Sequence, residues 1–308
     1  MRVTANGIAI EVDDQGPRGG EPLLLVMGLG MQLTAWPQAL VDDLVARGFR
    51  VVRLDNRDAG LSEGFDHLGV PSLPWAALKH TLRLPVRAPY GIADMAADAL
   101  GVLDALGLAS AHVCGASLGG MIAQHLAARH PDRVRSLVLM MTTTGARRLP
   151  QATPKVQRLL LSRPSGRDPD AVVAHLVRLL SVIGSPAYQP DPVEMRERLG
   201  EMVRRAWRPA GTARQLIAVA ADGDRTRLVQ HIHAPTRVIH GDADPLIPVA
   251  AGHALAKNIR GAVLDIVHGM GHDLPAALLP RFAEAIAVNA ARPSAPHPAA
   301  APAPPAPS

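Results

Sequence analysis

Short apolar runs alternate with segments of helical spacing between residues 23 and 141. The runs are residues 23–27, 50–54, 111–114 and 133–141, and the helical segments are 33–48, 90–107 and 121–130. Continuous apolar runs are typical of parallel strands that are buried on both faces. Strands that alternate with helices predict an α/β fold with a mainly parallel, doubly wound sheet.

The segments that precede and interrupt this alternation have other patterns. Residues 2–14 predict two short strands, because Ile8, Ile10 and Val12 alternate with smaller or polar residues after the turn Asn6-Gly7. The sheet is therefore expected to begin antiparallel. Residues 65–89 are irregular and rich in proline, which predicts a long loop or a short helical excursion.

The pattern changes after Thr142 and divides the chain into four parts. Residues 145–230 contain several helical segments without a convincing buried strand, which predicts a helical cap inserted over the sheet. Strands resume at 237–240 and 262–267, and a closing helix follows at 275–291, interrupted by Pro280. We therefore expect a core in two parts, 1–144 and 231–291, the cap at 145–230, and a disordered Pro/Ala-rich tail at 292–308.

The composition of the 308 residues fits a globular protein, with 48% hydrophobic and 19% charged residues. The chain opens without an apolar signal segment and has no run near the ~20 apolar residues that a membrane span needs. A cytoplasmic protein without an integral membrane segment is expected. The single cysteine, Cys114, is expected to be a small buried residue, since it has no partner for an intramolecular disulfide.

The net charge of +5 is concentrated in the predicted cap. Residues 146–230 contain 15 Lys/Arg against 8 Asp/Glu, whereas the remainder has 17 against 19. Solvated faces of amphipathic helices are the favoured interpretation, with attraction for acidic substrates as the alternative. No nucleic-acid motif appears. No metal site is indicated, because His125 and His130 are five residues apart, a poor spacing for ligands on one helix face.

The candidate chemistry centres on Ser117, in the sequence Gly115-Ala116-Ser117-Leu118-Gly119. This G-x-S-x-G pattern lies between a predicted strand and a predicted helix, the context in which a serine is presented on a tight turn above a sheet. The first free N–H of the helix, at Leu118, points at the site and can stabilise an oxyanion. The glycine-rich loop after residues 23–27 offers Leu29 as a second N–H donor.

A nucleophilic serine needs a histidine to take its proton and an acid to orient that histidine. His272, in the loop after the last strand, is the candidate base, and His268 is a weaker one. Asp244 and Asp242 both follow the strand at 237–240, and the spacing G-x-x-D-x-x-x-P favours Asp244.

Three further charged residues follow the strand at 50–54. They are Asp55, Arg57 and Asp58. Residues of these types can be catalytic, but an ion-paired structural loop is the favoured interpretation.

With these motifs placed, the chain resembles the α/β-hydrolase fold family from about residue 3 to residue 288. The matching segments are 55–62, 115–120, 241–244 and 271–272. Residues 25–30 and 35–37 resemble the bacterial serine esterases that include aclacinomycin methylesterase. In that group Met-Gly replaces the usual His-Gly, as at Met27-Gly28 here.

The resemblance implies an eight-stranded sheet and hydrolysis of a small-molecule carboxylic ester through an acyl-enzyme, without a cofactor. It implies the catalytic set Ser117, Asp244 and His272, with an oxyanion hole at Leu29 and Leu118. A methyl esterase or a lipase fits this reading. A carbon–carbon bond hydrolase or a cofactor-free perhydrolase uses the same triad, and a non-catalytic ligand-binding receptor is a further alternative. The oligomeric state stays open.

Overall fold

An eight-stranded sheet forms the centre of the computed structural model, which describes residues 1–82, 84–166 and 168–293, except the side chains of residues 80 and 81. The strand order is β1-β2-β4-β3-β5-β6-β7-β8. β1 and β2 join antiparallel, β2 and β4 also pair antiparallel, and all later pairs are parallel. The predicted α/β sheet with an antiparallel start is confirmed. The strands are β1 (Arg2–Ala5), β2 (Ile8–Gln15), β3 (Glu21–Val26), β4 (Phe49–Leu54), β5 (Ala111–Ala116), β6 (Val134–Met140), β7 (Thr236–Gly241) and β8 (Val263–Val267).

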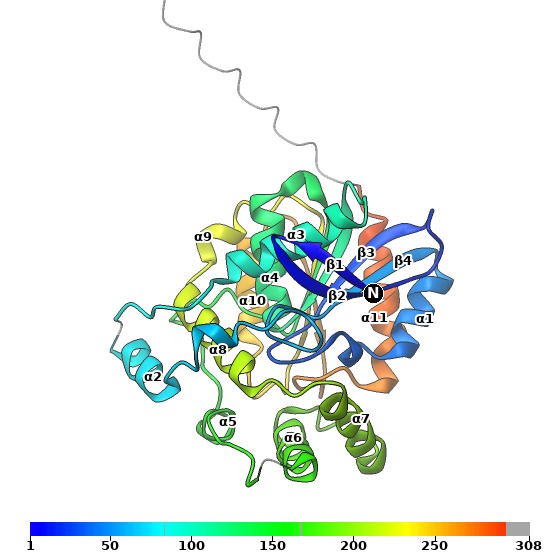
Figure 1. Ribbon diagram of the computed structural model, residues 1–308. Helices are drawn as coiled ribbons and strands as arrows, with labels where there is room; N and C mark the ends of the chain where they lie inside the picture. The colour runs from blue at the N-terminus through cyan, green and yellow to red at the C-terminus, as the bar shows by residue number, and fades with distance from the viewer. Residues whose placement is uncertain (83, 167, 294–308) are drawn as a thin grey trace, which may run out of the picture.

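Helices cover both faces of the sheet (Figure 1). One face packs against α3 (Ile92–Ala105), α4 (Leu118–Arg129) and α10 (Ala250–Asn258), and the other against α1 (Gln38–Ala46) and α11 (Leu279–Ala290). The two hydrophobic cores on these faces fix the strands, so the loops at their carboxyl ends are held in place. In open α/β sheets, ligands bind at that end.

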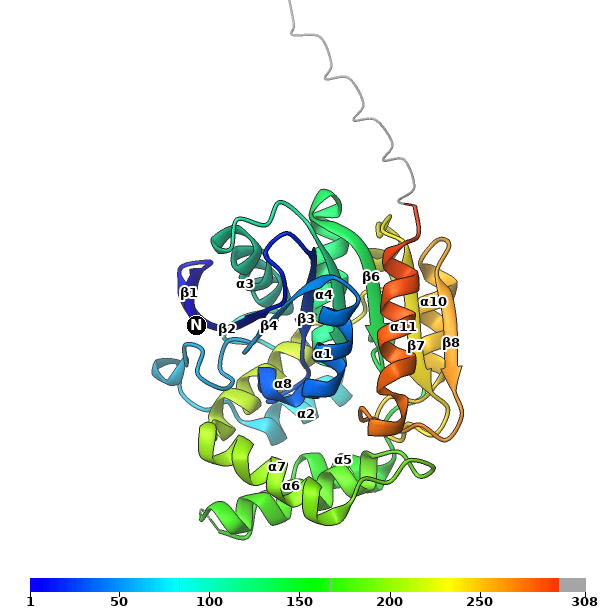
Figure 2. The same ribbon diagram turned by 90° about the vertical axis from the view of Figure 1, so that its right-hand side faces the viewer.

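Five helices lie between β6 and β7. They are α5 (Pro154–Leu160), α6 (Pro169–Ile183), α7 (Pro192–Arg205), α8 (Pro209–Asp222) and α9 (Thr226–Val229). We call this segment, residues 154–229, the β6–β7 insertion. Figure 2 shows α5, α6 and α7 as a layer beyond the end of the sheet, whereas α8 and α9 return to the core, where α8 contacts α3 and α9 contacts α4.

Prolines begin α5, α6, α7 and α8, because proline fits the first helical position, where its missing N–H needs no partner. Asp168 and Asp191 each precede such a proline and accept a hydrogen bond from a backbone N–H of the first turn. α6 and α7 then pack through a small apolar cluster of their own. The members of this cluster are Val172, Val173, Met195, Leu199, Met202 and Val203.

Two predicted helices differ in detail from the structure. The segment predicted at 33–48 is a 3-10 turn, Leu33–Ala35, followed by α1, with Pro37 between them. Pro280 lies in the first turn of α11 and does not interrupt it. The region 65–89, predicted as a long loop or a short helical excursion, contains a short helix, α2 (Leu73–Thr81). The predicted disordered tail lies almost entirely outside the described residues.

Candidate active site

Ser117 lies on a tight turn between β5 and α4. β5 ends at Ala116 and α4 begins at Leu118, so one residue makes the whole turn. Ser117 has φ +55°, a conformation that costs free energy in a residue with a side chain. Two hydrogen bonds hold it there: its N–H donates to the Met140 carbonyl at 3.0 Å, and the Thr142 hydroxyl donates to its carbonyl at 2.7 Å. The predicted strand–turn–helix context of this serine is confirmed.

The glycines of this turn allow strand and helix to come together. A Cβ atom at Gly119 would lie 2.0 Å from the Val26 carbonyl oxygen, and one at Gly115 would lie 2.3 Å from the Gly119 carbonyl oxygen. Both distances are far below van der Waals contact. A larger residue at either position would therefore displace the serine turn (residues 115–120) from the sheet.

Ser117, His272 and Asp244 form one hydrogen-bonded chain, although they come from three separate loops. The Ser117 Oγ atom lies 2.9 Å from His272 Nε2, and His272 Nδ1 lies 2.7 Å from Asp244 Oδ2. An ionised carboxylate only accepts hydrogen bonds, so Nδ1 carries the proton and Nε2 presents its lone pair to the serine hydroxyl. The imidazole is thus oriented to take the Ser117 proton.

The Asp244 carboxylate is itself fixed by the backbone. Its Oδ1 atom accepts hydrogen bonds from the N–H groups of Leu246 at 2.9 Å and Ile247 at 2.8 Å. The side chain is fully buried, and that of His272 is only 7% exposed. The two backbone hydrogen bonds hold Oδ1, so Oδ2 faces His272.

The alternative candidates, Asp242 and His268, form a second pair. His268 Nδ1 lies 2.7 Å from Asp242 Oδ2, the same distance as in the buried pair. The His268 side chain, however, is 97% exposed, and no hydrogen bond joins it to Ser117 among the residues described. Hydrogen bonds from the Gly269 N–H and from His268 hold the pKa of Asp242 below its usual value.

The two predicted oxyanion donors, Leu29 and Leu118, follow Gly28 and Ser117 directly in the chain. The glycine loop (residues 27–30) lies against the serine turn, since a Cβ atom at Gly28 would be 3.1 Å from Ser117 Cβ and 3.6 Å from its Oγ. Within the described part of the chain, neither the Leu29 nor the Leu118 N–H has a hydrogen-bond partner. Backbone N–H groups without a partner are the donors that an oxyanion requires.

Side chains from distant segments hold the glycine loop in place. The Asn56 amide donates to the Met27 carbonyl at 2.9 Å, and the Gly30 N–H donates to the Gln215 side chain of α8 at 2.8 Å. Gln215 also donates to the Arg57 carbonyl at 2.7 Å. Asn56 lies in a motif that resembles the family, but no local pattern indicated this bond.

The charged residues after β4 form ion pairs, as the favoured interpretation predicts. Asp55 pairs with Arg205 at 2.7 Å, Arg57 with Asp98 at 2.5 Å, and Asp58 with Arg214 at 2.7 Å. Burial alone would raise the pKa of Asp58, but hydrogen bonds from Arg214, Phe65 and Tyr90 lower it overall. These pairs join the core to the insertion and to α3.

Sequence reasoning missed two groups that surround the histidine and the acid. Ser185, at the end of α6, accepts a hydrogen bond from the Gly271 N–H at 2.8 Å and donates to the Asp273 carboxylate. The backbone N–H of His272 donates to the Ile183 carbonyl at 2.7 Å. Contacts across more than 80 residues leave no local signal in the sequence.

His240 is the second missed residue. It is fully buried beneath the loop that carries Asp244, and its Nε2 atom lies 2.8 Å from the Ile247 carbonyl oxygen. Nε2 therefore carries the proton, and the Asp244 Oδ2 atom lies 3.7 Å from it. Burial lowers the pKa of His240, so the ring supports the loop in its neutral form.

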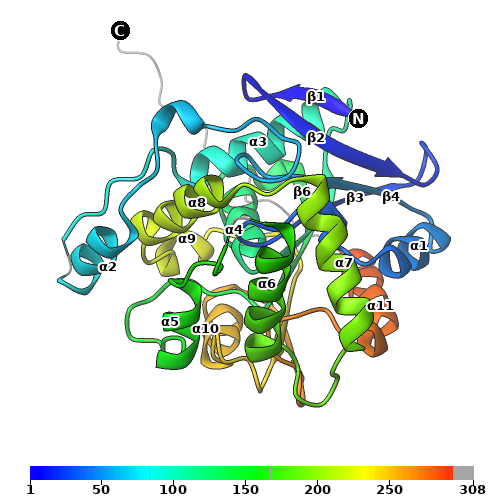
Figure 3. The same cartoon turned by 60° about the horizontal axis from the view of Figure 1, so that its bottom comes forward.

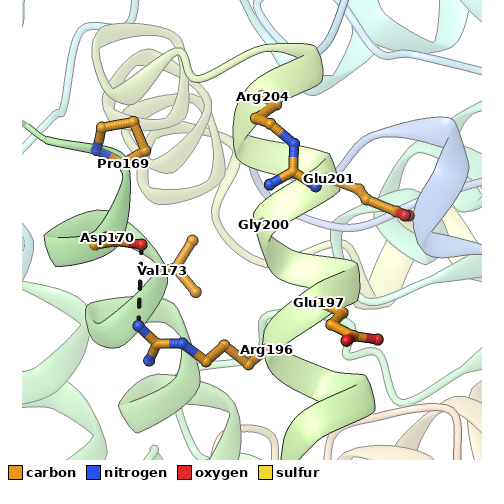
Figure 4. A pocket seen from close by; sticks show the side chains of 8 residues that line it. All are labelled: Pro169, Asp170, Val173, Arg196, Glu197, Gly200, Glu201 and Arg204. Carbon is orange, nitrogen blue, oxygen red and sulfur yellow. Dashed lines mark ion pairs between the residues drawn. The ribbon is translucent and has the colours of Figure 1, made fainter.

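Two cavities border α7. One, of about 350 Å³, lies beside Met31, two residues beyond Leu29, and is lined by apolar residues such as Leu180 and Met202 together with Arg198 and Arg205. The other, of about 430 Å³, is a charged groove between α6 and α7 (Figure 4). None of Ser117, Asp244 and His272 lines this groove.

Neither a metal site nor a membrane-spanning helix is found among the residues that the structure describes. In residues 1–82, 84–166 and 168–293, no group of three or more His, Cys, Asp or Glu side chains is placed to hold a metal ion. No helix in these ranges is long and apolar enough to cross a membrane. Cys114 is fully buried, as expected, and burial raises the pKa of its thiol.

Comparison with known proteins gives the class of the chain. A family model described as "alpha/beta hydrolase fold" matches residues 21–274. The chain therefore belongs to the α/β hydrolases, as the motifs predicted.

Particular relatives come from several kinds of hydrolase. The chain is 29% identical over 312 residues to rhodomycin D methylesterase of Streptomyces sp. strain C5, covering 93% of this chain and 96% of the relative. It is also 29% identical to the 2-hydroxymuconate semialdehyde hydrolase of Pseudomonas sp. strain CF600, covering 88% and 86%. The enol-lactonase structure from Burkholderia xenovorans LB400 superposes with a TM-score of 0.72 at 24% identity, covering 94% and 99%, which shows the common fold.

Proposed function

We propose that this protein is a serine carboxylic-ester hydrolase. The observation that carries the proposal is the hydrogen-bonded chain from Ser117 through His272 to Asp244. The N–H groups of Leu29 and Leu118, which have no partner among the described residues, are the proposed oxyanion donors. A nucleophile, an oriented base and two oxyanion donors are the parts that acyl transfer requires.

The reaction follows from these positions. Ser117 Oγ attacks the ester carbonyl carbon while His272 Nε2 takes its proton, and the N–H groups of Leu29 and Leu118 bind the oxyanion. His272 returns the proton to the departing alkoxide, which leaves an acyl-enzyme. Water then attacks the acyl carbon with His272 as the base, the carboxylic acid leaves, and Ser117 regains its proton. Asp244 stabilises the imidazolium in both halves.

The relatives narrow the substrate class. The methylesterase named above acts on a methyl ester by its name, and it matches nearly the whole of this chain. The cavity beside Met31, which apolar residues line together with Arg198, Glu201 and Arg205, is the space that we assign to the acid part of the ester. A small alcohol leaving group and a larger acid part that carries both apolar and polar groups fit this arrangement.

Kinetics on p-nitrophenyl esters from acetyl to palmitoyl test the proposal. The Ser117→Ala variant should lose at least about 10⁴-fold in kcat/KM, because only the nucleophile is removed. Circular dichroism should show an unchanged fold. Wild-type activity that survives the substitution would contradict the role of Ser117.

A carbon–carbon bond hydrolase is the second candidate, because 2-hydroxymuconate semialdehyde hydrolase is also 29% identical to this chain, over 278 residues against 312 for the methylesterase. The same triad would then cleave a vinylogous diketone. Wild-type protein that is inactive on every ester but releases acid from such a diketone would favour this function.

A further inference from the structure

Exposed apolar side chains gather in one short segment, outside the proposed site. Of the twelve large hydrophobic residues exposed among those described, six lie between residues 68 and 84. We call this segment, residues 68–82 and 84–87, the α2 lobe. Contiguous exposed apolar surface usually marks an interaction site. The six residues are Leu68, Val70, Trp75, Leu78, Leu82 and Leu84.

Helix α2 presents its apolar side chains to solvent. Trp75 and Leu78 are 56% and 46% exposed, and Leu82, one turn beyond Leu78, is 58% exposed. Residues at these spacings lie on one side of a helix. Ala76, on another side, is buried, and α2 contacts α8. Figures 1 and 3 show α2 beside α8 at the edge of the molecule, away from the sheet.

The Lys, Arg, Asp and Glu residues in this part of the chain are all positively charged ones. Residues 67–93 include Lys79, Arg83 and Arg87 but no Asp or Glu. The Lys79 ammonium lies 5.4 Å from the centre of the Trp75 ring, within cation–π range, and Arg87 is exposed. The apolar surface is thus bordered by cations without a neighbouring carboxylate in the same segment.

We propose that the α2 lobe docks on an anionic lipid surface. Helices that lie in a membrane interface combine tryptophan and leucine with Lys/Arg, and each cation near an anionic surface adds attraction. A second copy of the chain is a poorer occupant, because a twofold contact would set Lys79 and Arg87 against the same cations. The lobe lies outside the proposed catalytic chain, so docking does not depend on the esterase proposal.

Vesicle sedimentation with the full chain tests this. We expect binding to vesicles of equal phosphatidylglycerol and phosphatidylcholine, and little to phosphatidylcholine alone. Lys79→Gln should weaken partitioning about fivefold. Trp75→Ser/Leu78→Ser should weaken it about tenfold or more, because apolar contact is lost. Leu161→Ser, an exposed leucine of the insertion at 50% exposure, is the matched control and should bind normally.

Two further measurements separate vesicle docking from catalysis and test whether Trp75 contacts the lipid. Ser117→Ala should bind vesicles like the wild type, which separates docking from catalysis. Trp75 emission should shift to shorter wavelength on binding, and Trp75→Phe should remove that shift. Absence of binding, equal binding to both vesicles, or an equal loss in Leu161→Ser would overturn the proposal. A concentration-dependent dimer abolished by Trp75→Ser/Leu78→Ser would overturn it in favour of self-association.

Discussion

At the scale of single residues, Asp244 and Asp242 differ in what their histidines can reach. Both carboxylates lie 2.7 Å from a histidine Nδ1 atom. The His272 ring is buried and continues to Ser117 at 2.9 Å, whereas His268 ends in solvent. The distance between the acid and its histidine therefore does not distinguish the two pairs. The contact between His272 and Ser117 does.

Substitution of the two acids tests this assignment. Asp244→Asn should lower kcat/KM by about 10⁴-fold, because the amide no longer fixes the required tautomer of His272. Asp242→Asn, the matched control, should change kcat/KM by less than about threefold, since its histidine points away. Steady-state kinetics on a p-nitrophenyl ester measures both. Equal losses in the two variants would contradict the choice of Asp244.

His240 gives a pH dependence of stability. Burial lowers its pKa below the ordinary value of 6.5, so the unfolded chain binds a proton that the folded chain resists. The contribution of neutral His240 to stability is therefore complete above about pH 6.5 and is lost as the pH falls. His240→Gln should flatten the decline of the thermal midpoint between pH 7 and pH 5.

The exposed His253 provides the control for this measurement. His253→Gln should follow the wild-type decline of the midpoint across the same pH range. A decline in His240→Gln as steep as that of the wild type would show that folding does not lower the pKa of His240.

At the scale of elements, the end of α6 and the residues just after it hold the loop that carries His272. Ser185 binds the Gly271 N–H, and the Ile183 carbonyl binds the His272 N–H. A Cβ atom at Gly271 would lie 2.4 Å from the Gly184 carbonyl oxygen, so the two segments are in close contact. The position of α6 and that of the histidine are thus linked.

Removal of this link should slow chemistry more than it weakens binding. Ser185→Ala leaves the Gly271 N–H and the half-buried Asp273 carboxylate without their hydroxyl partner, and desolvation already raises the pKa of Asp273. We expect kcat to fall about tenfold with little change in KM, because a small displacement of His272 weakens proton transfer. Full kinetic analysis separates the two constants.

Ser181→Ala is the matched control for Ser185. Ser181 lies on α6 one turn earlier, is exposed, and donates only to the Val177 carbonyl. Its loss should leave kcat unchanged. If Ser185→Ala raises KM instead of lowering kcat, Ser185 acts on substrate binding and not on the histidine.

The sequence predicted elements where local pattern determines them. Apolar runs identified the parallel strands, and G-x-S-x-G placed Ser117 between β5 and α4. Pro37 and Pro280 show where prediction from local pattern ends. A proline can break a helix or begin one, and only the packing of the neighbouring residues decides which of the two occurs. Ser185 acts through Gly271 and Asp273, which are more than 80 residues away, so no local pattern revealed it. The role of His240 depends on its burial beneath the loop that carries Asp244, which no local pattern shows either.

At the scale of the whole molecule, Arg205, which is half-buried, joins α7 to a buried carboxylate of the core. Arg205 donates to the fully buried Asp55 carboxylate at 2.7 Å and to the Gln32 side chain at 2.6 Å. Gln32 in turn donates to the Met202 and Ala206 carbonyls. Arg205 and Asp55 are 150 residues apart, so the sequence alone did not pair them.

The same helix carries a second arginine pair of a different kind. Arg196 lies 4.0 Å from Asp170 across the groove between α7 and α6 (Figure 4), with side chains that are 54% and 92% exposed. Exposed pairs contribute little to stability, whereas removal of one partner of a buried pair leaves an uncompensated charge. The two arginines therefore allow a comparison within one helix.

Arg205→Met should lower the free energy of unfolding by about 3 kcal/mol, the low end for a broken buried pair, because Arg205 is itself 21% exposed. Arg196→Met should lower it by less than about 1 kcal/mol. Urea unfolding measures both, and Asp55→Asn combined with Arg205→Met should recover part of the loss, since the buried charge is gone. Equal losses in the two single variants would show that the Arg205–Asp55 contact does not join α7 to the core.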